Sequence, residues 1–116
     1  MLGRLILIGG CLAVLIAGTA PGFARTAKCL LVVDGKTYID GPCDFTAKKE
    51  QFEISNRGTG KGLFFAIVDT EPEGAEGFWN AERGATHAHS RLGPLKRQGG
   101  CWVNDRAKVC AWAKGK

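Results

Sequence analysis

Short runs of alternating apolar and polar residues make up much of the chain after residue 24, and this period-2 pattern predicts β-strands with one buried face. Residues 51 to 55, QFEIS, alternate in this way. Residues 63 to 69, LFFAIVD, are instead a continuous apolar run of strand length, which predicts a central strand covered on both faces. Residues 85 to 93, ATHAHSRLG, alternate small and polar residues and predict an edge strand.

Turn signals separate these runs and limit the number of strands. Two β-rich runs flank Asp34 and Gly35, the strongest short-range hairpin signal, and the resulting register places Leu31 opposite Tyr38. Residues 70 to 84 contain one proline and several glycines, which predict a long irregular loop. We therefore expect an all-β, mainly antiparallel domain: a small disulfide-clipped barrel or sandwich of six or seven short strands.

The first 24 residues have the pattern of a secretory signal peptide. A positive charge at Arg4 precedes an apolar run over residues 5 to 17, and small residues at Gly22 and Ala24 fit the cleavage rule. The apolar run is shorter than the about 20 residues that a membrane-spanning helix needs. The sequence therefore predicts a signal peptide over residues 1 to 24, no permanent membrane anchor after cleavage, and a single periplasmic or secreted domain over residues 25 to 116.

The exported domain retains four of the five cysteines, and an even number in a short exported chain predicts a disulfide framework. If Asp105 and Arg106 form a two-residue hairpin loop, Cys101 lies directly opposite Cys110, at the close approach of a cross-strand disulfide. The spacing differs from CxxC, so a redox pair or a zinc knuckle fits poorly. We predict a Cys101–Cys110 bridge.

The second predicted bridge joins Cys29 to Cys43. Cys43 follows a Gly41-Pro42 turn, which would fold it back onto Cys29. Each bridge closes a short loop and is expected to stabilise the domain by about 3 kcal/mol.

Charge is distributed unevenly along a chain whose net charge is +5. Residues 69 to 82 carry five acidic residues and no basic one, whereas residues 83 to 116 carry eight basic residues and one acidic one. A basic C-terminal third would attract an anionic envelope polymer or an acidic protein, although a solvated surface explains the same charges. Nucleic acid is not an expected partner, because the chain is exported and has no base-stacking or groove-reading motif.

Few residues offer chemistry. His87 and His89 would point to the same face of a strand, a spacing that can chelate a transition metal, but the sequence fixes no third ligand. Glu71, Glu73 and Glu76 are a candidate acid/base cluster of the glycosidase kind, placed in the predicted loop. We therefore assign no catalytic residue, no metal site and no cofactor.

The combination of export, small size and a rigid clipped scaffold favours a non-enzymatic binding or inhibitory module of the bacterial envelope, acting on a protein or cell-wall partner. In size and compartment the chain resembles periplasmic inhibitors of lysozyme-type hydrolases, although no motif is shared. The alternatives are a small metal- or carboxylate-dependent hydrolase acting on cell-wall material, and a secreted effector.

Function is expected in the segment from residue 71 to residue 97, the longest stretch without strong strand character. This segment combines aromatic residues, which supply contact area, with polar residues, which orient a partner. Of these, Trp79 and Arg91 are expected to be the most sensitive to substitution. The predicted partner-binding residues are Phe78, Trp79, Asn80, His87, His89 and Arg91.

Overall fold

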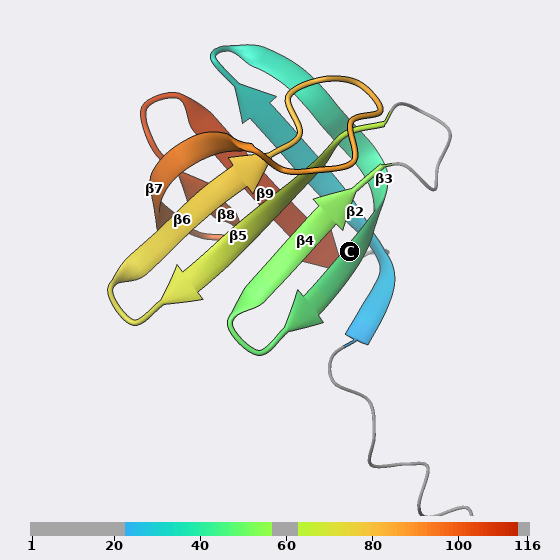
Figure 1. The fold of residues 1–116 in the computed structure, drawn as a ribbon. Helices are drawn as coiled ribbons and strands as arrows, with labels where there is room; N and C mark the ends of the chain where they lie inside the picture. The colour runs from blue at the N-terminus through green and yellow to red at the C-terminus, as the bar shows by residue number, and fades with distance from the viewer. Residues whose placement is uncertain (1–22, 57–62, 114–116) are drawn as a thin grey trace, which may run out of the picture.

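A computed structural model describes residues 23 to 56 and 63 to 113, which form a closed barrel of eight antiparallel strands (Figure 1). Each strand pairs with the next along the chain, and β9 pairs with β2 to close the barrel. No helix occurs in these two ranges. The strands are β2 (Phe23–Val33), β3 (Lys36–Lys48), β4 (Gln51–Ser55), β5 (Phe65–Glu71), β6 (Gly74–Trp79), β7 (Ser90–Gln98), β8 (Cys101–Val103) and β9 (Ala107–Ala113).

The all-β antiparallel prediction is confirmed, and the architecture is a barrel rather than a sandwich. The predicted count of six or seven strands is wrong, because the described residues form eight. The predicted signal peptide lies mostly outside the described residues. Strand β2 begins at Phe23, two residues before the predicted mature start, and the cleavage position stays a prediction.

Period-2 alternation places the core inside the barrel. In β2 the buried residues are Ala27, Cys29, Leu31 and Val33, whereas the residues between them are exposed or half-buried. The side chains of successive strand residues point to opposite faces, so one set fills the interior and the other faces outward. The partner strands obey the same rule, and Leu31 faces the buried Val109 of β9.

Residues 70 to 84, predicted as an irregular loop, are mostly strand and turn. Strand β5 continues to Glu71, a turn follows at residues 72 and 73, and β6 begins at Gly74. One of the glycines on which the loop prediction rested, Gly77, is buried within β6. A Cβ at this position would lie 2.7 Å from Leu95 Cδ1 and 3.2 Å from the Cβ of Leu92. Glycine is therefore required here by core packing and is not a turn signal.

The prediction that β5 is covered on both faces is also wrong. Ala66 and Val68 are fully buried inside the barrel, but Ile67 between them is only half-buried and lies opposite Phe78 of β6. In a closed barrel of this size the outer face of a strand has no second layer to cover it.

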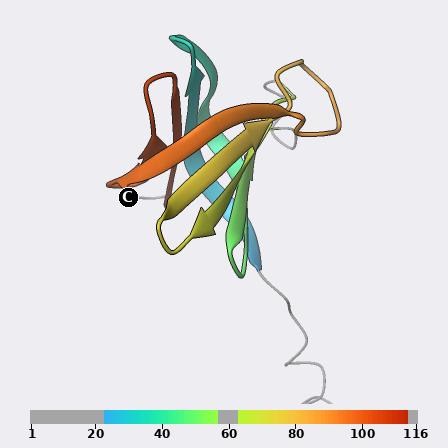
Figure 2. The ribbon, with the colours of Figure 1, turned by 60° about the vertical axis from the view of Figure 1, so that its left-hand side comes forward.

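The edge strand predicted over residues 85 to 93 starts later and is not an edge. Strand β7 begins at Ser90 and pairs with both β6 and β8, while residues 80 to 89 form a loop. Phe78 pairs with Arg91 and Gly77 with Gly93, so Leu92 is an extra residue in a β-bulge. Gly93 has a φ of 92°, and β7 curves strongly across the barrel (Figure 2). Bulges of this kind bend a strand and increase its twist.

The predicted hairpin at Asp34 and Gly35 is confirmed, and both residues have positive φ, 52° and 80°, as a type I′ turn requires. The predicted register is wrong beyond the first pairs, because Leu31 lies opposite Ile39 instead of Tyr38. A β-bulge shifts the pairing by one residue at this point.

The bulge between β2 and β3 is explained by the packing of Tyr38. Tyr38 meets the rings of Phe64 and Trp79 edge to face, with ring centroids 5.0 and 4.6 Å apart. These aromatic rings pack against the core below them. The extra residue in β3 therefore allows Tyr38 and the adjacent buried Ile39 both to contact the barrel interior.

Both predicted disulfides are present. The Cys29–Cys43 bridge lies inside the barrel, where both residues are fully buried and their Cα atoms are 5.8 Å apart. The predicted Gly41-Pro42 turn does not exist, since both residues lie within β3, where Gly41 pairs with Cys29. Cys43 instead pairs with Ala27, so the bridge runs diagonally between neighbouring strands.

The Cys101–Cys110 bridge is the predicted cross-strand clip. The two residues lie directly opposite each other in β8 and β9, with Cα atoms 4.0 Å apart. Asn104 N donates a hydrogen bond to Ala107 O, which closes a turn around the two residues expected to form the loop.

Candidate functional site

The barrel has two ends with different surfaces. The upper end carries the β2–β3 turn, the β8–β9 turn and the loop of residues 80 to 89, which crosses it in orange in Figure 1. The lower end carries the turns at residues 49 to 50, 72 to 73 and 99 to 100. Four of the six predicted partner-binding residues reach the surface, and all four lie toward the upper end.

Asn80 fixes the 80–89 loop to the barrel. Its Oδ1 accepts a hydrogen bond from Phe65 N at 3.1 Å, and its Nδ2 donates to the carbonyls of Leu63 at 2.9 Å and of Glu82 and Ala85 at 3.1 Å. Asn80 is buried, and these bonds use both its donor and its acceptor groups. The structure thus places this predicted contact residue in a structural role, holding the start of the loop.

Trp79 also lies beneath the surface. It is 5% exposed and packs against Tyr38, with Phe64 stacked at a centroid distance of 6.3 Å. A partner that docks on the surface reaches little of this indole. Trp79 supports the loop from the interior, so the expectation that it is a principal contact has no support from its position.

His87 and His89 are exposed and lie side by side, with their rings stacked at a centroid distance of 5.2 Å and an interplanar angle of 28°. They lie in the loop and not on a strand, so the period-2 argument that joined them does not apply. Thr86 Oγ1 lies 3.1 Å from His87 Nδ1. The pair borders a surface hollow of about 600 Å³. Its lining residues are Asn80, Ala81, Glu82, Ala85, Thr86, His87, His89 and Ser90.

Phe78 and Arg91 form a cross-strand pair just below this loop, where β6 ends and β7 begins. Arg91 Nε donates to Glu76 Oε2 at 2.9 Å, and the Arg91 side chain is 64% exposed. Phe78 and Arg91 thus lie on the two strands that the loop with the two histidines connects. We name Phe78, His87, His89 and Arg91 the loop patch.

Where their backbone pairing stops, β7 and β8 are joined by side-chain hydrogen bonds along a line that we call the seam. The sequence reasoning missed this feature. The two strands pair only over residues 96 to 98 and 101 to 103. Beyond that pairing, Asn104 Nδ2 donates to the carbonyls of Leu92 and Pro94, both at 2.9 Å. Asn104 Oδ1 accepts from the backbone N–H groups of Arg106 and Ala107. One amide side chain therefore replaces strand pairing and shapes the turn.

Arg106 extends this seam to a third element. Its Nε and Nη2 donate to Asp34 Oδ1 and Oδ2, each at 3.0 Å, and its Nη1 donates to Arg91 O at 2.9 Å. The hydrogen bond from Arg106 holds the pKa of Asp34 below its usual range, and the same bond raises the pKa of Arg106. We call this contact between Arg106 and Asp34 the clamp. Its one trace in the sequence is that Asp105 and Arg106 occupy a turn in which Asn-Gly is preferred.

The acid/base candidates lie on the outer wall. Glu71, Glu73 and Glu76 border a groove of about 530 Å³ together with Lys96 and Asp105. Arg91 already forms an ion pair with Glu76. Within the described ranges, no three histidine, cysteine, aspartate or glutamate side chains are grouped as ligands for a metal ion.

A smaller cavity, of about 220 Å³, lies at the lower end of the barrel and combines aromatic side chains with one arginine. The residues that line this cavity come from strands far apart in the chain, so no local sequence pattern predicted the cavity. The lining residues are Phe45, Phe52, Thr70, Arg97, Gly100, Trp102 and Ala111.

Comparison with known proteins identifies no relative of this molecule. No protein-family model matches the chain, and neither the curated proteins nor the solved structures show a significant similarity to it.

Proposed function

We propose that this chain is a small exported protein of the bacterial envelope that acts as a non-enzymatic binding or inhibitory module for a protein or cell-wall partner. The observation that carries the proposal is the anchored 80–89 loop. The Asn80 side chain donates three hydrogen bonds and accepts one, which hold the loop at one end of the barrel, and the loop presents the stacked pair His87 and His89 to solvent.

A loop that is ordered before binding is suited to recognition. Association costs free energy for every side chain and loop segment that it immobilises, so a preformed surface leaves more of the contact energy as affinity. Here the loop stands on a closed barrel with two disulfides. Binding residues on loops held by a rigid scaffold are a recurrent arrangement.

The chemistry of the loop patch indicates what the partner must offer. Phe78 provides apolar area, and the histidines provide ring nitrogens that donate or accept hydrogen bonds. Arg91 provides an exposed guanidinium that also pairs with Glu76. Aromatic and arginine side chains are common in the residues that dominate binding energy. We infer a partner surface with an apolar centre and acceptor or acidic groups around it.

The hydrolase alternative uses the same histidines with Glu71, Glu73 and Glu76. We favour the binding role because Arg91 is the direct ion-pair partner of Glu76 in this structure. The Glu76 carboxylate is therefore already bound by a side chain of the same barrel.

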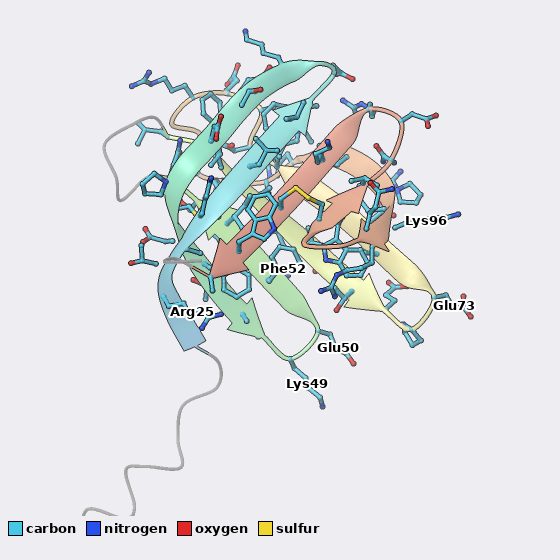
Figure 3. All side chains as sticks on the ribbon, turned by 180° about the vertical axis from the view of Figure 1, so that it is seen from behind. Arg25, Lys49, Glu50, Phe52, Glu73 and Lys96 are labelled. Carbon is cyan, nitrogen blue, oxygen red and sulfur yellow. A yellow bond between two sulfur atoms is a disulfide. The ribbon has the colours of Figure 1, made fainter. Side chains whose placement is uncertain are left out.

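The test is capture of a partner from envelope extract with the exported chain, followed by measurement of its affinity for two variants. His87→Ala with His89→Ala should weaken binding by about tenfold or more, equivalent to about 1.4 kcal/mol. Lys49→Ala with Glu50→Ala is the matched control. It removes two exposed side chains at the opposite end and leaves the net charge unchanged (Figure 3).

The control variant should bind as the unmodified chain does. Equal affinity of the histidine variant and the unmodified chain would contradict the proposal, as would a loss that occurs only in the control. Turnover of a cell-wall substrate that is abolished by Glu71→Gln or Glu73→Gln would support the hydrolase instead.

A further inference from the structure

The lower mouth of the barrel is a built cavity, distinct from the loop patch at the upper end. Phe45 and Phe52 stack at a centroid distance of 5.6 Å and form one wall, and Trp102 lines it from β8. Phe52 points into the barrel in Figure 3. Thr70 and Ala111 also line the cavity. An eight-stranded barrel is just wide enough for its side chains to fill, so small residues among large rings leave a gap.

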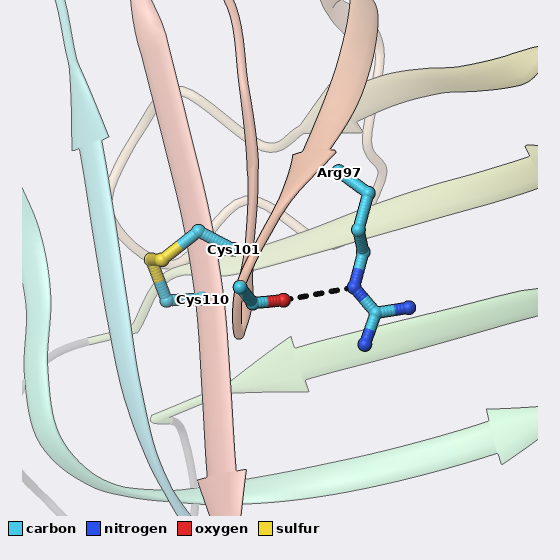
Figure 4. Close-up of a disulfide and its surroundings, with 4 residues drawn as sticks. Arg97, Cys101 and Cys110 are labelled. Carbon is cyan, nitrogen blue, oxygen red and sulfur yellow. Dashed lines mark hydrogen bonds between the residues drawn. A yellow bond between two sulfur atoms is a disulfide. The ribbon is translucent and has the colours of Figure 1, made fainter.

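A single guanidinium group lies at this apolar mouth. Arg97 pairs with Trp102 across β7 and β8, and its Cζ lies 5.5 Å from the centre of a Trp102 ring, within the range of a cation–π contact. Its Nε donates to Gly99 O at 2.9 Å (Figure 4). These two contacts orient the group, and its two terminal nitrogens make no hydrogen bond to any other described residue. The adjacent Lys96 points away from the barrel (Figure 3).

The size and chemistry of the cavity define a ligand class. Ligand sites combine apolar walls with a few oriented polar groups and occur in the mouths of β-barrels. The terminal nitrogens of arginine match the two oxygens of a carboxylate. The cavity measures about 220 Å³, below the about 300 to 1,000 Å³ of pockets for drug-sized ligands, so the ligand must be small.

We infer that the lower mouth binds a small amphiphilic carboxylate. Its ring or short chain lies between Phe52 and Trp102, and its carboxylate pairs with Arg97. This site is independent of the proposed partner surface, because it lies at the opposite end of the barrel and shares no residue with the loop patch.

Calorimetric titration of the exported chain tests the site with two probes of similar shape. The probes are 3-phenylpropionate and its neutral amide, 3-phenylpropionamide. The carboxylate should bind saturably with a Kd of about 1 mM or lower, and the amide at least about tenfold more weakly, since only the carboxylate pairs with the guanidinium.

Two neighbouring residues provide a matched pair of variants. Arg97→Gln should weaken carboxylate binding by about tenfold or more, whereas Lys96→Gln, which removes the same charge from the outer face, should change it less than about twofold. A third variant, Thr70→Leu, fills the cavity without changing the charge and should reduce the binding of both probes. Circular dichroism of each variant checks that the barrel is intact.

Several results would overturn the inference. These are no saturable binding of the carboxylate, equal affinity for carboxylate and amide, and equal losses in Arg97→Gln and Lys96→Gln. Chemical-shift changes on titration that concentrate in residues 80 to 89 instead of at Phe52 and Trp102 would also overturn it. None of these outcomes depends on whether the loop patch binds a partner.

Discussion

Single residues in this barrel have roles that their type alone does not reveal. Asn80 is a polar residue in a predicted binding segment, yet it is buried and serves the backbone of the loop. Gly77 occurs in a glycine-rich stretch, yet it leaves space for Leu92 and Leu95 in the core. The Cys101–Cys110 pair, in contrast, was predictable from hairpin geometry, whereas the Cys29–Cys43 pair was predicted through a Gly41-Pro42 turn that does not form.

The packing around Gly77 predicts how a larger residue at this position changes the stability of the barrel. Gly77→Ala should lower the free energy of unfolding by about 1 to 3 kcal/mol, because the added methyl group meets Leu95 Cδ1 and the Cβ of Leu92. Urea unfolding monitored by tryptophan fluorescence measures the change. In a Leu95→Val background, which removes Cδ1, the same substitution should cost less. An equal cost in both backgrounds would show that Leu95 is not the obstacle.

At the scale of elements, the strands were predicted better than their registers. Alternation identified β4, and the turn signal identified the β2–β3 hairpin, because both patterns are local. The bulges at Tyr38 and Leu92 were not predicted, since period-2 alternation does not report an extra residue in one strand. The rings that Tyr38 contacts, Phe64 and Trp79, are also distant from it in sequence. The seam residues Asn104 and Arg106 were missed for the same reason.

The Arg106–Asp34 clamp between two turns has a pH signature. The pKa of Asp34 is lowered in the folded state, so its contribution to stability is present above the pKa of the unfolded chain, about 3.9. The contribution is lost as pH falls through the folded pKa. Asp34→Asn should therefore lower the melting temperature at pH 7 and make little difference near pH 2.

This effect should be small and should decrease with salt, because both side chains are exposed. Asn is a suitable replacement since it tolerates the positive φ of residue 34. A melting-temperature difference between Asp34→Asn and the unmodified chain that stays constant from pH 7 to pH 2 would show that the carboxylate charge is not responsible.

At the scale of the whole molecule, the sequence predicted an all-β domain but not its closure. Closure depends on pairing between β2 and β9, the first and last described strands, and no local pattern reports such a contact. The lower cavity likewise depends on how six strands meet at one end. The loop patch was partly predictable, because its four residues are close in sequence.

The two disulfides should supply a large share of the net stability of this small barrel. Loop-closure entropy gives about 3 kcal/mol for each bridge, against a total of about 5 to 15 kcal/mol for a typical domain. Reduction should therefore lower the melting temperature strongly or unfold the domain. A Cys101→Ala with Cys110→Ala variant should be destabilised in oxidising buffer and should lose less on reduction. An unchanged melting temperature in reductant would show that the core is sufficient alone.

The pairing of β2 with β9 has a consequence for how the chain can be reconnected. Ala27 and Ala113 are partners in that pair, so the two ends of the described barrel are adjacent in space. A short linker joining them, with new termini opened in the turn at residues 72 and 73, would preserve every other strand connection and both disulfides. The barrel is therefore a suitable candidate for circular permutation, because its closed order of strands is the same wherever the chain begins.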